Sequence, residues 1–225
     1  LEQHDLTEVD VYQVQGPVNL HRVSALADAV DRPDLKFPPQ TPGFQDRLGP
    51  NVDPFQALAD GPVLLHHPYE SYAPVVSLLT RAATDPDVLA VKMTLYRTGS
   101  QSPIVDALIN AARHGKEVTA VVELRARFDE AANIDLATRL QEAGAKVAYG
   151  VVGYKCHAKM MMVVRREEGV LRRYVHLGTG NYHTGTARFY TDFSLLTSDV
   201  EMGEDVHKVF LQLTSLGSVL HMKRL

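Results

Sequence analysis

Two hydrophobic patterns alternate along residues 63–151, and this alternation constrains the fold more than any other feature of the sequence. Short apolar runs rich in strand-forming residues lie at 63–65, 88–96, 117–124 and 146–151, and stretches with helical spacing lie between them, at 72–83, 103–114 and 129–143. Gly115 and Gly144 follow two of the helical stretches, where a glycine commonly ends a helix. Strands separated by helices of about a dozen residues predict right-handed crossovers and a mostly parallel sheet.

The pattern changes to neighbouring strands after Gly153. Strand-like runs at 155–164 and 172–177 flank the polar segment 165–170, whose glycine predicts a hairpin tip. A further strand at 192–196 leads into a helix at 203–216. A hairpin added to parallel crossovers predicts an α/β fold with a mixed, largely parallel sheet flanked by helices.

The first 62 residues differ from the rest. A short strand is expected at 9–13 and a helix at 19–30, where apolar residues recur at helical spacing. Seven of the twelve prolines of the chain then fall between residues 31 and 62. Because proline cannot continue a helix or a central strand, this stretch is predicted to be a linker with extended segments.

Composition excludes several classes of protein. The 45% hydrophobic and 22% charged residues are typical of a globular chain, and the net charge of −4 argues against a general nucleic-acid surface. Cys156 is the only cysteine, so no intrachain disulfide can form and a reducing cytoplasm is expected. No apolar run approaches the roughly 18 residues that span a bilayer. A first residue of Leu instead of Met indicates a piece of a longer protein.

Basic residues are concentrated in one part of the chain. Between residues 153 and 190 there are seven Lys or Arg residues and two acidic ones, so the remainder of the chain is acidic. The sharpest motif, Lys155-Cys156-His157-Ala158-Lys159, lies inside this basic segment. In a strand, Lys155, His157 and Lys159 would share a face, and two neighbouring cations would favour a neutral, nucleophilic imidazole. A solvated edge strand is the alternative explanation of this spacing.

The turn Gly178-Thr179-Gly180-Asn181 directly follows the expected strand at 172–177. Two glycines with a hydroxyl and an amide can present backbone N–H groups to an anion. The hairpin would bring this turn beside His157. A histidine, a lysine and an anion-binding loop together suit phosphoryl transfer, in which the imidazole attacks phosphorus and cations hold the oxygens.

Two arginines, Arg97 and Arg127, stand where expected strands end. Because the carboxyl ends of parallel strands face the ligand crevice, both side chains could converge on one phosphate site. Arg188 and Tyr190 could supply a cation and an aromatic face for a nucleotide, or could pack the next strand. The histidines at 66, 67, 176 and 183 fall in no metal-ligand motif and are interpreted as structural.

The His157-x-Lys159 pair followed by the Gly178–Asn181 turn resembles the signature of the phospholipase D superfamily. Val164 stands where that signature has Asp, and the hairpin lengthens the gap before the glycine turn. With these departures, the segments 95–97, 123–130, 176–181 and 186–192 resemble bacterial polyphosphate kinases of the first type, and the match runs from about residue 10 to 216.

The resemblance implies a longer enzyme, in which residues 1–43 are the end of a head domain with its linker and residues 44–225 are the first of two phospholipase D-like catalytic domains. It implies reversible transfer of the ATP γ-phosphate to inorganic polyphosphate with Mg²⁺, a cytoplasmic or peripherally membrane-associated homo-oligomer, and no nucleic-acid partner. The second histidine-lysine half would lie beyond Leu225, so the fragment alone is expected to be inactive.

The resemblance also assigns residue roles. His157 would become phosphorylated with Lys159 beside it, Tyr190 would contact the nucleotide, and Arg97 and Arg127 would belong to the phosphate and magnesium site. Arginine has no acceptor lone pair, so both should hold phosphate oxygens beside the metal. Thr179, Asn181 and Arg188 complete the predicted nucleotide and phosphate contacts. The alternatives are a phospholipase D-type phosphodiesterase or nuclease that completes its site by dimerisation, and a non-catalytic phosphate-binding module.

Overall fold

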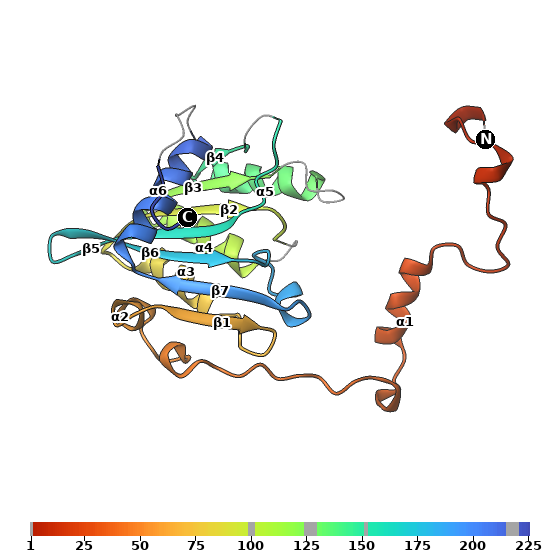
Figure 1. Ribbon diagram of the computed structural model, residues 1–225, viewed down its shortest axis with the longest axis horizontal. Helices are drawn as coiled ribbons and strands as arrows, with labels where there is room; N and C mark the ends of the chain where they lie inside the picture. Colours follow the sequence, from red (N-terminus) through yellow and green to blue (C-terminus); the bar gives the residue numbers. More distant parts are fainter. Residues whose placement is uncertain (1, 99–101, 124–129, 151–152, 215–220) are drawn as a thin grey trace. The chain divides into compact units, whose positions relative to one another are not determined.

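The computed structural model describes residues 2–98, 102–123, 130–150, 153–214 and 221–225 (Figure 1). The chain divides into two units, 1–40 and 41–225. Seven strands of the second unit form one sheet in the order β1-β7-β6-β5-β2-β3-β4. The strands are β1 (Val63–His67), β2 (Val88–Leu95), β3 (Glu117–Val122), β4 (Lys146–Ala148), β5 (Lys159–Glu167), β6 (Val170–Gly178) and β7 (Asp192–Thr197).

The sheet is mixed, as expected. Strand β2 pairs in parallel with β3, and β3 with β4, whereas the pairs β2-β5, β5-β6, β6-β7 and β7-β1 are antiparallel. Parallel pairing is therefore less extensive than expected, because the β5-β6 hairpin lies in the middle of the sheet and its strands alternate in direction. The mixed α/β fold class is confirmed.

Helices cover both faces of the sheet (Figure 1). On one face lie α2 (Pro54–Ala59), α3 (Ala73–Thr84), α4 (Pro103–Arg113) and α5 (Glu130–Glu142), and on the other α6 (Val200–Thr214). Alternate residues of β5 divide between the two cores: Met161 and Val163 pack with the first group, Met160 and Met162 with α6. Because successive side chains of a strand point to opposite faces, the continuous apolar run of β5 marks a strand buried on both sides.

Two glycines end helices as the sequence predicted. Gly115 and Gly144 follow α4 and α5 with φ of 76° and 94°. These left-handed conformations cost glycine little, whereas a side chain would be strained there. Helix α4 buries Ile104 and Leu108 completely. Each such side chain contributes roughly 1.5–3 kcal/mol when it leaves water.

The first unit differs from its prediction. The strand expected at 9–13 is absent, and a 3₁₀ helix, Glu8–Asp10, lies there instead. The expected helix at 19–30 is present as a 3₁₀ turn, Leu20–Val23, followed by α1 (Ser24–Ala29). Every described side chain from 3 to 40 is exposed, and Val9 and Tyr12 are 86% and 87% exposed. A strand needs a partner for its backbone groups, and the described part of this unit supplies none.

The proline-rich stretch contains one helix that the sequence prediction missed. Pro54 begins α2, and the Asp53 side chain accepts a hydrogen bond from the backbone N–H of Phe55. Proline is favoured in the first turn because that position needs no N–H donor. Phe55 and Leu58 of this helix are 3% and 0% exposed, so the stretch is part of the core near its end. Two 3₁₀ turns, Pro33–Leu35 and Asp46–Leu48, precede it.

Strand β5 begins four residues later than expected. His157 and Lys155 precede the strand, so the prediction that they share a strand face with Lys159 is wrong. The hairpin tip is also tighter than expected, because β5 and β6 continue to Glu167 and Val170 around a turn of Glu168 and Gly169. Both turn residues have positive φ, 50° and 82°, as a two-residue hairpin loop requires.

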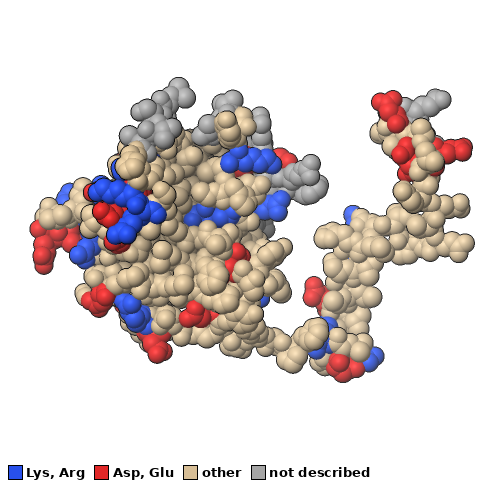
Figure 2. All heavy atoms as spheres, viewed as in Figure 1, with Lys and Arg blue, Asp and Glu red and all other residues tan. Residues whose placement is uncertain are grey.

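Surface charge is mixed on the face shown in Figure 2, where Lys and Arg side chains are interspersed with Asp and Glu. Within the described residues, no helix combines the length and the apolar character that crossing a membrane would require.

Candidate functional site

The predicted nucleophile, lysine and glycine loop meet at one cavity of about 390 Å³. Its walls come from the end of β2, the start of β5, the end of β6 and the loop before β7. The lining residues are Arg97, His157, Lys159, Thr179, Gly180, Asn181, His183, Thr186, Tyr190 and Asp192. The β5-β6 hairpin joins the two motifs, because Lys159 pairs with Gly178 across the strands.

His157 is exposed to the cavity, and its environment favours the neutral ring. Partial burial lowers the pKa of His157, and the Lys159 ammonium lowers it further. The direction matches the sequence-based expectation, but desolvation is the larger cause. The His157 ring meets the Tyr96 ring edge to face, with 5.1 Å between their centres.

Lys159 is buried, with 6% of the residue exposed. Its Nζ donates a hydrogen bond to the His157 carbonyl at 2.6 Å and lies 5.4 Å from the centre of the Tyr96 ring. Desolvation lowers the pKa of Lys159, and the charge of Asp192 opposes this shift. The cation is therefore held at the wall of the cavity by the main chain just before β5.

The glycine loop is built against the Asp192 carboxylate. Thr179 Oγ1 donates to Asp192 Oδ1 at 2.7 Å and accepts from Phe193 N at 2.9 Å. A Cβ added at Gly180 would overlap the Asp192 carboxylate. The glycine is therefore required by close packing. Asp192 is a site residue that the sequence analysis did not select, although it ends the segment 186–192 on which the resemblance rests.

The other predicted residues divide into three groups. Arg97 and Tyr190 line the cavity, with the Arg97 guanidinium 5.8 Å from the centre of the Tyr96 ring and Tyr190 64% exposed. Arg188 is exposed and is absent from the cavity wall. Arg127 lies outside the described residues.

His183 was interpreted as structural, but it lines the cavity. Its Nδ1 accepts a hydrogen bond from Thr186 N at 3.1 Å, so the neutral ring carries its proton on Nε2. A Cβ added at Gly185 would lie 2.8 Å from His183 Cε1, so the loop closes tightly around this ring. No sequence spacing indicates this arrangement, because it depends on how the loop folds back.

The other three histidines that were interpreted as structural, His66, His67 and His176, contact residues of β7 or of the loop before it. His176 and His67 are buried, and their rings are hydrogen bonded to Tyr182 Oη at 2.7 Å and Ser194 Oγ at 2.8 Å. Burial lowers the pKa of His176 to about 3, with a smaller contribution from His67. His66 stacks on Phe193. These three contacts fit the structural role predicted for these residues.

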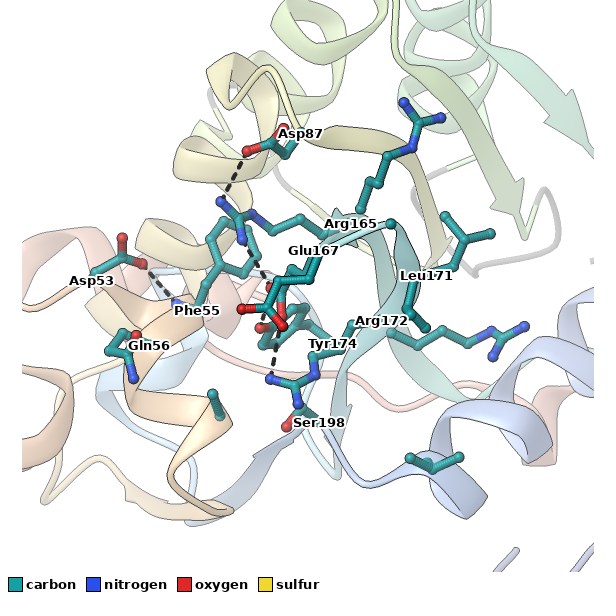
Figure 3. Close-up of a pocket in the computed structure, with 17 residues that line it drawn as sticks. Asp53, Phe55, Gln56, Asp87, Arg165, Glu167, Leu171, Arg172, Tyr174 and Ser198 are labelled. Atoms are coloured by element: carbon teal, nitrogen blue, oxygen red, sulfur yellow. Dashed lines mark hydrogen bonds and ion pairs between the residues drawn. The ribbon is translucent and has the colours of Figure 1, made fainter.

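A larger cavity of about 1000 Å³ lies at the far end of the β5-β6 hairpin (Figure 3). Two of its four arginines are paired: Arg165 contacts Asp85, Asp87 and Glu167, and Arg172 contacts Glu167. The wall also holds four acidic residues, Asp53, Asp87, Glu167 and Glu168, so its formal charge is balanced and offers an anion little net attraction. The smaller cavity is the better candidate for phosphoryl chemistry.

Metal-ligating groups are sparse at the site. The described residues contain no group of three or more His, Cys, Asp and Glu side chains that could hold a metal ion. Asp192 is the only carboxylate among the described residues of the cavity wall. One carboxylate suits Mg²⁺ that remains bound mainly to substrate phosphates and water, rather than a resident metal cage.

Comparison with known proteins identifies the family of this chain. The family model described as polyphosphate kinase C-terminal domain 1 matches residues 53–218. The polyphosphate kinase of Pseudomonas aeruginosa strain PAO1 is 58% identical over all 225 residues, which cover 33% of that protein. The chain thus spans about a third of the length of the curated relatives it matches.

Two solved structures resemble this chain. The polyphosphate kinase of Porphyromonas gingivalis is 33% identical with a TM-score of 0.77, over 92% of this chain and 34% of that one. NucT from Helicobacter pylori shares the fold alone, at 16% identity and a TM-score of 0.51 over 68% of this chain and 94% of that one. With the matched domain covering most of its length, the chain belongs to the polyphosphate kinase family.

Proposed function

We propose that this chain carries the phosphoryl-accepting half of a polyphosphate kinase site, with ATP and inorganic polyphosphate as substrates. The observation that supports the proposal most is the single cavity shared by His157, Lys159, Arg97 and the Thr179–Asn181 loop. A neutral imidazole next to two cations and a glycine loop can attack phosphorus while the phosphoryl oxygens are held.

The proposed transfer has two steps. A ring nitrogen of His157 forms a bond to the γ-phosphorus of ATP as the bond to the β-phosphate oxygen breaks, and ADP leaves with that electron pair. A terminal oxygen of polyphosphate then attacks the phosphohistidine, the P–N bond breaks, and the polymer is one phosphate longer. The reverse sequence makes ATP from ADP, because each step is an exchange of similar phosphoryl bonds.

Residues of the cavity wall would act on the phosphoryl group electrostatically. Lys159 and Arg97 stabilise charge on its equatorial oxygens, and the backbone of the glycine loop with the Thr179 and Asn181 side chains binds neighbouring phosphates. Asn181 lines the cavity, where its Nδ2 amide could donate hydrogen bonds to phosphate oxygens. Tyr190 offers its exposed ring to the nucleotide base.

The remaining assignments stay predictions. Arg127 and Arg188 are proposed phosphate and nucleotide contacts, and Mg²⁺ is proposed to enter with ATP as its phosphate complex. Residues 1–43 are proposed to be the end of a head domain and 44–225 the first of two catalytic domains. A homo-oligomer in the cytoplasm or at the membrane surface, and inactivity of the isolated chain, follow from the same resemblance.

Labelling of the full-length enzyme with γ-labelled ATP tests the proposal. The expected result is an acid-labile, base-stable label that disappears in His157→Ala and remains in His114→Ala, which changes an exposed histidine at the end of α4. Absence of label on the intact enzyme, or its persistence in His157→Ala, would overturn the proposal. Hydrolysis of a phosphodiester without ATP would favour the phosphodiesterase alternative instead.

A further inference from the structure

The main chain at His157 lies outside the sheet. Strand β5 and its ladder with β6 begin at Lys159, and residues 153–158 belong to no strand. A nucleophile must nevertheless be held in a fixed direction toward phosphorus. We propose that two buried side chains, Thr94 and Glu123, are positioning residues that fix the His157 main chain from both sides; this inference rests on the function proposed above.

Thr94 holds the residue that follows His157. Thr94 lies on β2, and 2% of the residue is exposed. It donates a hydrogen bond to the Ala158 carbonyl at 2.7 Å and accepts one from Met160 N at 3.0 Å. One hydroxyl can do both, because it has one proton and two lone pairs. Thr94 thereby fixes the main chain at Ala158, one residue before β5 begins.

Glu123 holds the residue that precedes His157. It follows β3 directly and is 4% exposed. Its Oε2 accepts a hydrogen bond from Cys156 N at 2.8 Å, and its own N–H donates to Leu95 O at 2.9 Å. A charged acceptor makes a stronger bond to a backbone N–H than a neutral one does. The residue before His157 is thus tied to the ends of β2 and β3 through its N–H.

Asn133 of α5 fixes the strand ends that carry these two residues. Its side chain is buried, and Nδ2 donates to Tyr96 O at 3.0 Å and to Glu123 O at 2.8 Å. Both amide protons are therefore used to join the carboxyl ends of β2 and β3. The bond to Tyr96 O also fixes the backbone of Tyr96, whose ring meets His157. The backbone next to Arg97 is fixed with it.

None of the three side chains lines the cavity. They would act through the backbone on either side of His157, and so they are positioning residues. A misplacement of about 1 Å at a reacting group can reduce the rate roughly 100-fold. Loss of either bond should therefore slow attack on phosphorus more than it weakens binding of ATP.

The test uses the full-length enzyme with a matched pair at one position. Thr94→Val keeps the shape and removes the hydroxyl, whereas Thr94→Ser keeps the hydroxyl. At saturating ATP we expect phosphohistidine formation to slow by about 10- to 100-fold in Thr94→Val and to stay within about threefold of wild type in Thr94→Ser. The KM for ATP should change little in either variant. Both should remain folded at the assay temperature, although the loss of two buried hydrogen bonds lowers the unfolding midpoint of Thr94→Val.

A second pair applies the same logic at the other side of His157. Glu123→Gln keeps an acceptor oxygen for Cys156 N, and Glu123→Met removes it at similar volume. The methionine variant should form phosphohistidine more slowly than the glutamine variant. If Thr94→Val does not unfold cooperatively, this pair decides the question.

The outcomes separate the inference from the function on which it rests. Wild-type rates in Thr94→Val, or in the Glu123→Met variant where that pair decides, would overturn the positioning role. A rate that falls only in parallel with ATP affinity or with the folded fraction would overturn it as well. Label that persists in His157→Ala would instead overturn the proposed function itself.

Discussion

At the scale of single residues, the state of His157 is set by where its ring lies. Partial burial and the Lys159 ammonium both disfavour the imidazolium, so the pKa of His157 is below the ordinary value of 6.5. Lys159 in turn is buried, and its Nζ cannot move away without losing its bond to the His157 carbonyl. Under the proposed function, the attacking ring would be kept neutral mainly by desolvation and further by the Lys159 cation.

The pH dependence of phosphohistidine formation follows from this shift. A lowered folded-state pKa means that the neutral, reactive ring persists to more acidic pH. We therefore expect the acid limb of the rate profile to have its midpoint below pH 6.5. Single-turnover labelling of the full-length enzyme measures this midpoint. The pH should run from about 4.5 to about 8, on both sides of the ordinary histidine pKa of roughly 6.5. A midpoint above 6.5 would contradict this description.

Gly180 should tolerate no side chain. In Gly180→Ala the new Cβ would overlap the Asp192 carboxylate, so the glycine loop must shift. We expect a loss of about 1–3 kcal/mol in the free energy of unfolding, as for other overpacked sites, together with slower labelling of His157. Urea unfolding measures the first quantity. Gly49→Ala is the control, because its Cβ would meet no atom closer than 3.8 Å and its φ is −63°.

At the scale of elements, most helices and strands lie within a few residues of their predicted positions. The helical spacing of 103–114 became α4, Pro103–Arg113, because its apolar face packs on the sheet. The errors occurred where tertiary contacts overrule local pattern. Pro54 begins a helix after the Asp53 cap, and β5 starts only where β6 is available to pair with it.

Helix α6 anchors the last described residues through Asp205. Its carboxylate accepts hydrogen bonds from the backbone N–H groups of Arg224 and Lys223, at 2.6 and 2.7 Å, and from Lys208. These bonds, with that to Arg224 the largest cause, lower the pKa of Asp205 to about 2. The carboxylate is therefore more stabilised in the folded protein than in the unfolded chain.

The stability of the domain should depend on this carboxylate in acid. Because the folded pKa lies below the unfolded value of 3.8, the contribution is complete above about pH 4 and is lost as pH falls toward about 2. Asp205→Asn should be less stable than wild type near neutral pH, and the difference should shrink below pH 3.8. Denaturant unfolding at several pH values measures both. A difference that stayed constant with pH would contradict the role of the charge.

At the scale of the whole molecule, the buried side chains belong to residues 41–225, and the described side chains from 3 to 40 are all exposed. The second unit has its own two-sided core around the sheet. The mildly acidic net charge of −4 averages a basic segment around His157 with acidic surroundings. The proposal of a phosphate ligand therefore rests on the local charge around His157 and not on the net charge of the chain.

Removal of residues 1–40 from this chain should leave the fold of the remainder intact. The described core clusters contain only residues of the second unit, so the deletion removes none of their packing. We expect the thermal unfolding midpoint of 41–225 to remain within about 2 °C of that of the full chain, since a change of 1 kcal/mol would move it by roughly 2–4 °C. Circular dichroism or calorimetry measures the midpoint. A larger decrease would show that the first unit supports the core.

The sequence by itself determined the α/β class, most of the elements and the two motifs of the site, because periodicity and turn chemistry are local properties of the chain. Only the tertiary structure decided which residues share the cavity and which hold His157. Asp192 reaches the cavity at the start of β7 and His183 through the loop before it, and Thr94 and Glu123 bind residues 64 and 33 positions away along the chain. Such bonds exist because β5 lies beside β2 in the sheet, and local pattern does not encode strand order.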